Sequence, residues 1–158
     1  MRRSVRVNLD IERKLKPSAP RTEVDLVAYR PAKNELWIIE CKSWLNSQGV
    51  KAAALTDSNH KGAKRFKLFH DDEYLNSVSD ALIEQFQMKD MAPRVRLCLV
   101  AGKIAGSSEP DLATHFQKRN WELKGPEWVR KGLIKLAEGP YENDVATIAA
   151  KILSGDME

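Results

Sequence analysis

The chain has 158 residues, of which 42% are hydrophobic and 30% are charged. This balance is typical of one folded domain and argues against a disordered chain. No apolar run approaches the roughly 20 residues that a membrane-spanning helix needs, and no apolar segment follows the first basic residues, as it would in a signal peptide. Two cysteines within apolar runs, Cys41 and Cys98, fit a reducing compartment better than a disulfide framework. We therefore expect a single cytoplasmic domain, residues 1–158, with no membrane association.

The net charge of +4 hides an uneven distribution. Residues 1–70 hold 15 Lys and Arg against 7 Asp and Glu, whereas residues 71–158 hold 11 against 15. A positive field over the first half suits a polyanionic partner such as nucleic acid. A solvated surface with an uneven charge split has the same composition, so charge alone does not decide between the two.

The first half of the chain has the residue patterns of β-strands. Apolar residues alternate with polar ones over residues 5–12, as in a half-buried strand. Residues 22–30 and 35–44 are rich in β-branched and aromatic residues, and they flank the turn signal Pro-Ala-Lys-Asn at residues 31–34. Together these segments predict a three-stranded antiparallel meander.

The register of the predicted hairpin brings charged residues together. With a turn at residues 31–34 and no bulge, Asp25 lies directly opposite Glu40, and Glu23 lies opposite Lys42. Residues paired in this way share a face of the sheet, with Cβ atoms about 4.5–5.5 Å apart. Lys42, two residues beyond Glu40, points to the same face. Two opposed carboxylates repel each other, so removing either one is not expected to destabilise the metal-free protein.

The strand before Glu40 adds to the case for a bound cation. Residues 36–39 are all apolar, which predicts burial on both faces of the sheet. A charge at the end of such a strand is costly unless something compensates it, and Mg²⁺ binds one or two carboxylates together with waters. A lysine beside the ion could position or deprotonate a water, or stabilise developing negative charge. The alternative is the solvated end of an ordinary hairpin, in which Lys42 neutralises Glu40 or Glu23.

Asp25 in one strand and the Ile-Glu-Cys-Lys that closes the next strand resemble the motif of the PD-(D/E)XK nuclease superfamily, which includes restriction enzymes and Holliday-junction resolvases. Valine precedes Asp25, where the name of the superfamily has proline. The resemblance implies a hydrolase, a nuclease that cleaves DNA with Mg²⁺ or Mn²⁺. It implies that Asp25 and Glu40 bind the metal and that the Cys41 carbonyl also ligates it. It further implies that Lys42 serves the attacking water.

Four further residues are candidates for accessory roles at such a site. In the superfamily a helix usually precedes the first strand and often supplies another acidic residue, for which this chain has little room. Asp10 or Glu12 could take its place, and Glu23 lies close in the predicted register. Some PD-(D/E)XK families place a helix glutamine at the metal, which points to Gln85 here. The alternative for Gln85 is a boundary residue that the backbone satisfies.

Residues 46–70 form a long polar segment after the hairpin. Five basic residues in this segment could track a phosphate backbone: Lys51, Lys61, Lys64, Arg65 and Lys67. Phe66 and Phe69 interleave with them, and a loop of this length is uncommon without a function. The alternative is a mobile surface loop whose phenylalanines pack into the core. The acidic run that follows, at residues 71–73, favours a helix N-terminus over the alternative of a second metal site.

The next elements complete the predicted fold. Residues 77–91 predict a helix, with Gln85 on its mainly apolar stripe, and residues 95–104 predict a buried strand parallel to its neighbour. Strand–strand–strand–helix–strand is the order of the superfamily's restriction-endonuclease-like core. We therefore predict an α/β fold with a mixed α+β sheet, a core over about residues 1–106 and a C-terminal helical part over about residues 107–158.

The C-terminal part is predicted to be mostly helical. Helices are expected over residues 110–120 and 127–138, a short strand over residues 121–123, and a last helix from residue 145. The last helix has an apolar stripe at helical spacing: Val145, Ile148, Ala149, Ile152 and Leu153. We expect this stripe to be buried, either against the sheet or in a homodimer contact.

Three functional hypotheses follow from these patterns. The leading one is a metal-dependent nuclease acting on DNA. The second is a catalytically inactive nucleic-acid-binding module of the same fold, and the third is a structural protein with a fortuitous motif. Divalent-metal binding separates the third hypothesis from the first two, and strand cleavage separates the first from the second.

Overall fold

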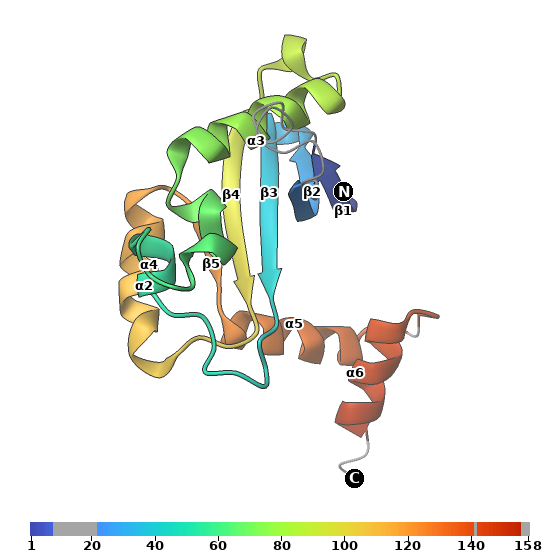
Figure 1. Ribbon diagram of the computed structural model, residues 1–158. Helices are drawn as coiled ribbons and strands as arrows, with labels where there is room; N and C mark the ends of the chain where they lie inside the picture. The colour runs from blue at the N-terminus through green and yellow to red at the C-terminus, as the bar shows by residue number, and fades with distance from the viewer. Residues whose placement is uncertain (8–21, 141, 156–158) are drawn as a thin grey trace.

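The computed structural model describes residues 1–7, 22–140 and 142–155. Among these residues the strands form one mixed five-stranded sheet in the order β1-β2-β3-β4-β5. They are β1 (Arg2–Val7), β2 (Thr22–Arg30), β3 (Glu35–Lys42), β4 (Arg94–Ala101) and β5 (Glu122–Lys124) (Figure 1). The first three strands are antiparallel, whereas β4 is parallel to β3 and β5 is parallel to β4. The predicted mixed α and β composition, antiparallel meander and parallel fourth strand are confirmed.

Helices and 3₁₀ turns occupy the connections between the strands from β2 onward and the segment that follows β5. They are α2 (Ala53–Thr56), the 3₁₀-helix η2 (Ala63–Phe69), α3 (Asp72–Gln85), α4 (Glu109–Lys118), α5 (Pro126–Glu138) and α6 (Val145–Gly155), with short 3₁₀ turns η1 (Pro31–Lys33), η3 (Lys89–Met91) and η4 (Gly106–Ser108). In Figure 1, α5 runs across the end of the sheet toward which β3 and β4 point, and α6 lies beyond it, away from the sheet. In the described part of the chain, no helix has both the length and the apolar character needed to cross a bilayer.

Most predicted elements agree with the structure within a few residues. The helices expected over residues 110–120 and 127–138 are α4 and α5, and the short strand expected over residues 121–123 is β5. The first strand begins earlier than predicted, at Arg2, and residues 8–12 of that prediction lie outside the described residues.

The hairpin turn fixes the register of β2 and β3. Pro31 begins the turn, and Asn34 closes it in the left-handed region with a φ of 48°. The Asn34 N–H donates to the Pro31 carbonyl over 3.0 Å, and the Tyr29 hydroxyl donates to the Asn34 side chain over 2.9 Å. As a result Arg30 pairs with Glu35, and the ladder has the predicted register.

Strand β3 buries one face, not two. Leu36 and Ile38 are fully buried, whereas Trp37 and Ile39 on the other face are half-buried. The prediction of burial on both faces is therefore wrong: residues of η2 and of the first turn of α3 line a cavity with Glu40 on one face, and Trp37 and Ile39 on the other face keep part of their surface exposed. Glu40 follows Leu36 and Ile38 on the covered face, and it is consequently one of the few buried charged residues.

Helix α3 begins five residues before the predicted start and ends six residues before the predicted end. Asp71 caps it, because its side chain accepts a hydrogen bond from the Tyr74 N–H over 2.9 Å. The acidic run at residues 71–73 therefore marks the N-terminus, as expected. The helix ends at Gln85 because Gln87 adopts a left-handed conformation, with a φ of 54°.

Helix α6 turns its apolar stripe toward solvent. Ile152 is 56% exposed and Leu153 is 78% exposed, so the expected burial of the stripe is wrong for the single chain. The side that contacts α5 carries Ala150 and Lys151 instead. The Lys151 ammonium donates to two carbonyls at the C-terminal end of α5, 2.8 and 2.6 Å away. These bonds satisfy carbonyls that the end of α5 leaves without helical partners, which sets the orientation of α6.

Candidate active site

Asp25 and Glu40 lie side by side on the central hairpin. The ladder between β2 and β3 runs from Arg30 opposite Glu35 to Leu26 opposite Ile39, and Asp25 and Glu40 are the next residues on the two strands. At this point one Asp25 carboxylate oxygen accepts a hydrogen bond from the Cys41 backbone N–H over 2.7 Å. The juxtaposition that the register predicts is therefore present, and a backbone contact holds Asp25 in it.

Lys42 joins the two carboxylates. Its ammonium group donates to a Glu40 carboxylate oxygen over 2.8 Å and lies 3.8 Å from an Asp25 carboxylate oxygen. The side chains of Lys42 and Glu40 are 18% and 10% exposed, and that of Asp25 is 40% exposed. Two carboxylates and one ammonium group thus converge at one point, open to solvent on the side of Asp25. The predicted flanking position of Lys42 is confirmed.

Burial dominates the electrostatics of Glu40. Burial raises the pKa of Glu40 above its ordinary value of 4.5, since the charged carboxylate loses water. The hydrogen bond and the charge of Lys42 lower the pKa, the negative charge of Asp25 raises it, and a hydrogen bond from the Asp25 backbone lowers it. The net direction is upward, so Glu40 is a carboxylate whose charge the fold only partly compensates.

A small cavity of about 110 Å³ borders Glu40. Its other lining residues come from the start of β2, from η2 and from the first turn of α3: Thr22, Glu23, Lys64, Arg65, Phe66, Lys67, Leu68, Phe69 and Tyr74. At about 30 Å³ per water, this space holds roughly three water molecules or an ion with part of its shell. The basic residues of η2 therefore line the same cavity as Glu40.

The side chains at this point offer few ligands, but they are of the kind that Mg²⁺ binds. Asp25 and Glu40 supply two carboxylates, and Mg²⁺ commonly binds one or two carboxylates and keeps several waters. Within the described residues, no group of three or more His, Cys, Asp and Glu side chains converges. The Cys41 thiol is exposed although Cys41 lies within an apolar run, and the Cys41 backbone N–H contacts Asp25. Its carbonyl remains the atom that the resemblance implies.

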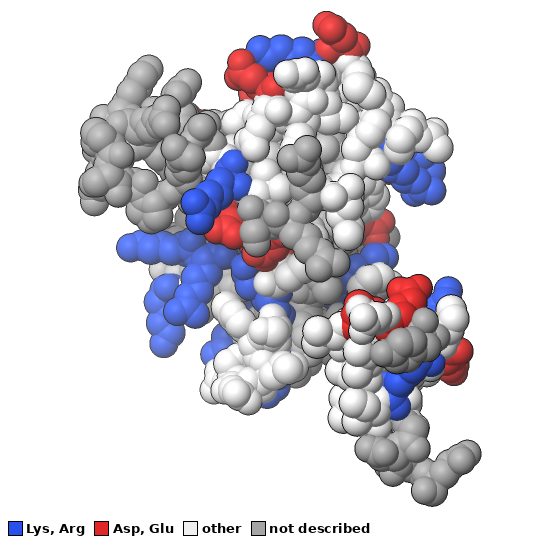
Figure 2. Space-filling model, turned by 90° about the vertical axis from the view of Figure 1, so that its right-hand side faces the viewer, with Lys and Arg blue, Asp and Glu red and all other residues white. Residues whose placement is uncertain are grey.

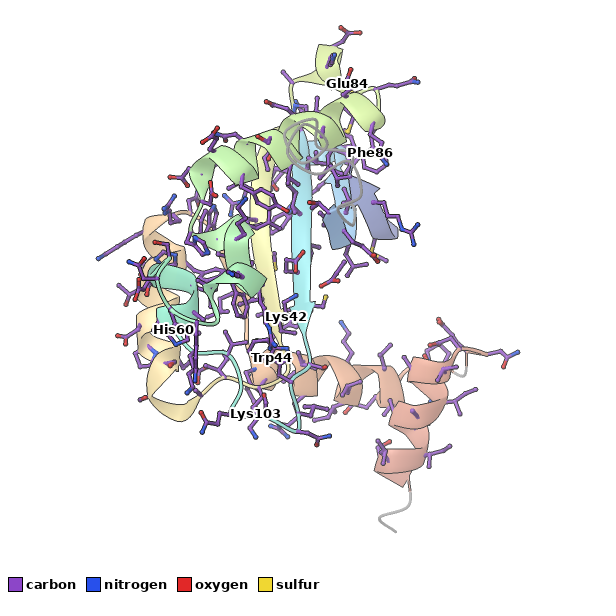
Figure 3. The ribbon with its side chains drawn as sticks, in the orientation of Figure 1. Lys42, Trp44, His60, Glu84, Phe86 and Lys103 are labelled. Atoms are coloured by element: carbon purple, nitrogen blue, oxygen red, sulfur yellow. The ribbon has the colours of Figure 1, made fainter. Side chains whose placement is uncertain are left out.

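The accessory candidates have different outcomes. Glu23 is exposed and lines the cavity beside Glu40. Gln85 is exposed at the end of α3, next to Phe86, which Figure 3 places at the opposite end of the sheet from Lys42. The predicted accessory role of Gln85 is therefore wrong, because the last turn of α3 lies far from the end of the hairpin that holds Lys42. Asp10 and Glu12 lie outside the described residues.

The basic segment is folded rather than looped. η2 is kinked at Phe66, and Phe66 and Phe69 are buried, whereas Lys64 and Lys67 are exposed. The phenylalanines pack into the core, as in the alternative interpretation, and are not available for stacking on bases. The cations remain at the surface, and Figure 2 shows Lys and Arg side chains gathered at the left of that view.

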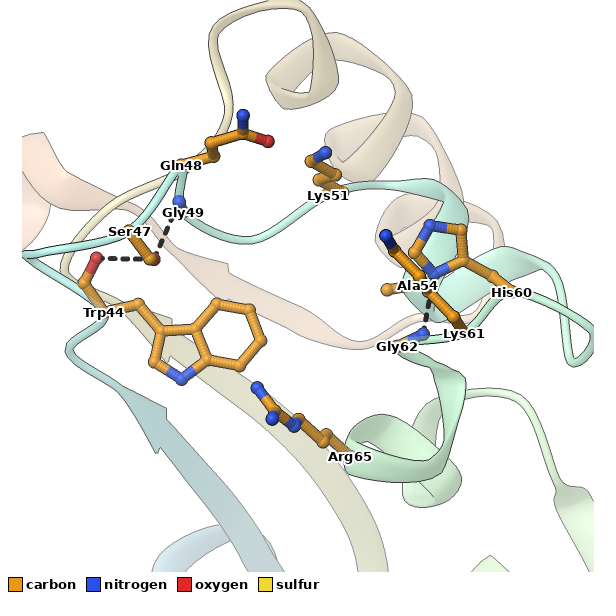
Figure 4. Close-up of a pocket in the computed structure, with 10 residues that line it drawn as sticks. All are labelled: Trp44, Ser47, Gln48, Gly49, Lys51, Ala54, His60, Lys61, Gly62 and Arg65. Carbon is orange, nitrogen blue, oxygen red and sulfur yellow. Dashed lines mark hydrogen bonds between the residues drawn. The ribbon is translucent and has the colours of Figure 1, made fainter.

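A larger cavity lies beyond the end of β3, and the sequence analysis did not single it out. Its volume is about 480 Å³. Figure 4 shows the residues that line it: Trp44, Ser47, Gln48, Gly49, Lys51, Ala54, His60, Lys61, Gly62 and Arg65. Arg65 lines both cavities, so the larger one adjoins the small cavity that borders Glu40. The sequence pattern that indicates this cavity is a tryptophan two residues after Lys42, followed by spaced basic residues.

The chain matches no protein-family model, no curated protein and no solved structure. The assignment of function therefore depends on the geometry and chemistry of these residues.

Proposed function

We propose that this protein is a nuclease that hydrolyses phosphodiester bonds in DNA with Mg²⁺ or Mn²⁺, and that its sheet and helices form a restriction-endonuclease-like core of the PD-(D/E)XK type. The observation that supports the proposal is the convergence of Asp25, Glu40 and Lys42 at the end of the hairpin. An ordinary polar strand end places charges in water. Here Glu40 is 8% exposed beside a second carboxylate, which is a costly arrangement that a cation would stabilise.

Each residue of the site has a distinct role in this proposal. Asp25 and Glu40 would hold the divalent cation, which when bound would polarise a phosphoryl oxygen and lower the pKa of water. The Cys41 N–H orients Asp25 through its 2.7 Å hydrogen bond. Lys42 positions the attacking water or stabilises the negative charge that develops on phosphate. Without metal, its ammonium compensates part of the negative charge of the two carboxylates.

The basic segment supplies the contact with DNA. Lys64 and Lys67 are exposed and line the cavity at Glu40, and Lys51 and Lys61 extend the positive surface. Such residues contact phosphates without regard to sequence, and binding weakens steeply with salt. We therefore expect the substrate backbone to follow η2 toward the carboxylate pair.

Nicking of supercoiled plasmid tests the proposal. The wild-type protein should nick with Mg²⁺ or Mn²⁺ and not in excess EDTA. Asp25→Asn and Glu40→Gln should each lose at least about 100-fold in rate, because each removes a metal-binding charge. Glu35→Gln is the matched control, because Glu35 is also 8% exposed on β3 but lies at the other end of the strand. Equal nicking by wild type and Asp25→Asn would refute the assignment.

The second candidate function is a nucleic-acid-binding module without turnover. It is favoured by the presence of only two carboxylates at the site within the described residues, and by the ammonium of Lys42 between them. A protein that binds DNA in a salt-dependent way but never nicks with either metal would establish this function instead.

A further inference from the structure

The cavity of about 480 Å³ beyond β3 has the size of a small-molecule site. Trp44 forms one wall, and Figure 4 shows Lys51, His60 and Lys61 across the opening from it, with Arg65 at its edge. The cavity therefore combines a flat aromatic surface with cationic groups arranged around it.

The charges of this cavity are of one sign. Three of its lining residues are cations and none is acidic. Across the described parts of the chain, no carboxylate lies within 4 Å of the charged groups of Lys51, Lys61 or Arg65. An uncompensated cluster of this kind attracts an anion. The carboxylate pair already has Lys42 as its counter-charge, so these three cations are available to a ligand.

The other polar groups of the cavity hold its walls in place. The Ser47 hydroxyl donates to the Trp44 carbonyl over 2.9 Å and accepts a hydrogen bond from the Gly49 N–H over 3.1 Å. His60 Nδ1 accepts a hydrogen bond from the Gly62 N–H over 3.0 Å. Both loops that border the cavity are therefore braced by local contacts.

The backbone at Trp44 is unusual. Its φ of 40° lies in the left-handed region, which bulky side chains rarely adopt. The indole and the Phe66 ring pack edge to face, with centroids 5.4 Å apart, and the Arg65 guanidinium lies over the indole ring, 5.7 Å from its centroid. The sharp turn after Lys42 thus presents the indole to the cavity, and Phe66 supports it from the core.

We propose that this cavity binds one unpaired nucleotide of the DNA strand, with its base stacked on Trp44 and its phosphate bound by Lys51 and Lys61. A base within a duplex has both faces covered by its neighbours, so only an unpaired or extruded base can stack on a protein ring. The inference rests on the proposed function, because Trp44 follows Lys42 by two residues and Arg65 lines both cavities. The inference implies that the substrates of the nuclease have single-stranded segments near the cleaved bond.

Binding measured in EDTA tests this inference apart from cleavage. Fluorescence anisotropy compares a short labelled single strand with a blunt duplex of the same length. Trp44→Leu should weaken single-strand binding about tenfold, which corresponds to about 1.4 kcal/mol. Duplex binding should change less than about twofold. Trp44→Phe should restore most of the single-strand affinity, because a phenyl ring still stacks.

A charge reversal gives a second test that does not disturb the core. Lys61→Glu should weaken single-strand binding more than Lys135→Glu, which makes the same change in net charge at an exposed position on α5. If Trp44→Leu does not fold, Trp44→Phe and the lysine pair decide. Equal effects of the two lysine reversals, or equal loss of duplex and single-strand binding in a folded Trp44 variant, would overturn the inference.

The outcomes separate this inference from the nuclease proposal. If the wild-type protein does not cleave DNA but its single-strand binding depends on Trp44, only the nuclease proposal is contradicted. If it cleaves DNA but its single-strand binding does not depend on Trp44, only the cavity assignment is contradicted. A free nucleoside monophosphate carries the same chemistry as a nucleotide within a strand, so it is titrated separately. Tighter binding of the free nucleotide than of the single strand would overturn the assignment to a DNA strand.

Discussion

Replacing Lys42 with methionine removes the ammonium group from the carboxylate pair and keeps most of the aliphatic side chain. A hydrogen bond to a charged group contributes about 1.5–3 kcal/mol, and breaking a buried ion pair costs up to about 3–5 kcal/mol. The side chains of Lys42 and Glu40 are 18% and 10% exposed and lie 2.8 Å apart. The contact with Asp25, at 3.8 Å and with a 40% exposed partner, adds little. We expect the free energy of unfolding of the metal-free protein to fall by about 2–3 kcal/mol.

Thermal melts in EDTA and in Mg²⁺ measure this change. For a protein of this size, the expected loss lowers Tm by roughly 4–12 °C in EDTA. Added Mg²⁺ should raise the Tm of Lys42→Met more than that of wild type, because the ion supplies the missing counter-charge without displacing an ammonium group.

The ion pair of Lys89 and Glu84 provides the control. Its groups lie 3.3 Å apart, but the side chains are 69% and 72% exposed. Lys89→Met should therefore change the free energy of unfolding by less than about 0.5 kcal/mol. If Lys42→Met is no less stable than Lys89→Met in EDTA, the electrostatic account of the site is refuted.

Three further predictions concern the two carboxylates and the second cysteine. In EDTA, Glu40→Gln should melt at or above the wild-type Tm, because it removes a buried charge beside another carboxylate. Asp25→Asn should lose about 1 kcal/mol, because it weakens the hydrogen bond from the Cys41 N–H; a gain in Tm for Asp25→Asn would contradict this. Burial raises the pKa of the Cys98 thiol from 9.0 to about 11, so the folded protein keeps a proton that the unfolded chain loses. The resulting contribution to the free energy of unfolding, about 2–3 kcal/mol, is fully present below pH 9 and is lost as the pH rises from 9 to 11. Denaturant titrations at pH 9 and pH 11 measure this loss. Cys98→Ala should abolish the difference between the two pH values.

The carboxylate pair was predictable from sequence because the hairpin that forms it is local. The turn needs only Pro31 at its start and a residue that tolerates the left-handed region, Asn34, at its end. Once the turn is fixed, the register follows along the strands, and Asp25 and Glu40 must meet. The burial of Glu40 was not fixed by this reasoning, since it depends on the helices that cover one face of β3.

The features that sequence reasoning missed depend on single tertiary contacts. The hydrogen bond from the Cys41 N–H to Asp25 replaces a ladder contact, and it changes the expectation that removing Asp25 simply relieves repulsion. The orientation of α6 is set by Lys151, which bonds to carbonyls at the end of α5. An apolar stripe such as that of α6 shows which residues favour burial, but it does not identify a surface that covers them.

A crystal soaked in Mn²⁺ tests the central claim most directly, because anomalous scattering locates the ion without relying on activity. The account predicts a peak within about 2.1 Å of one carboxylate oxygen of Asp25 and one of Glu40, at a distance typical of small divalent ions. It also predicts that the Lys42 ammonium moves away from the carboxylates. An ion bound well elsewhere, with the carboxylate pair still occupied by Lys42, would contradict the account.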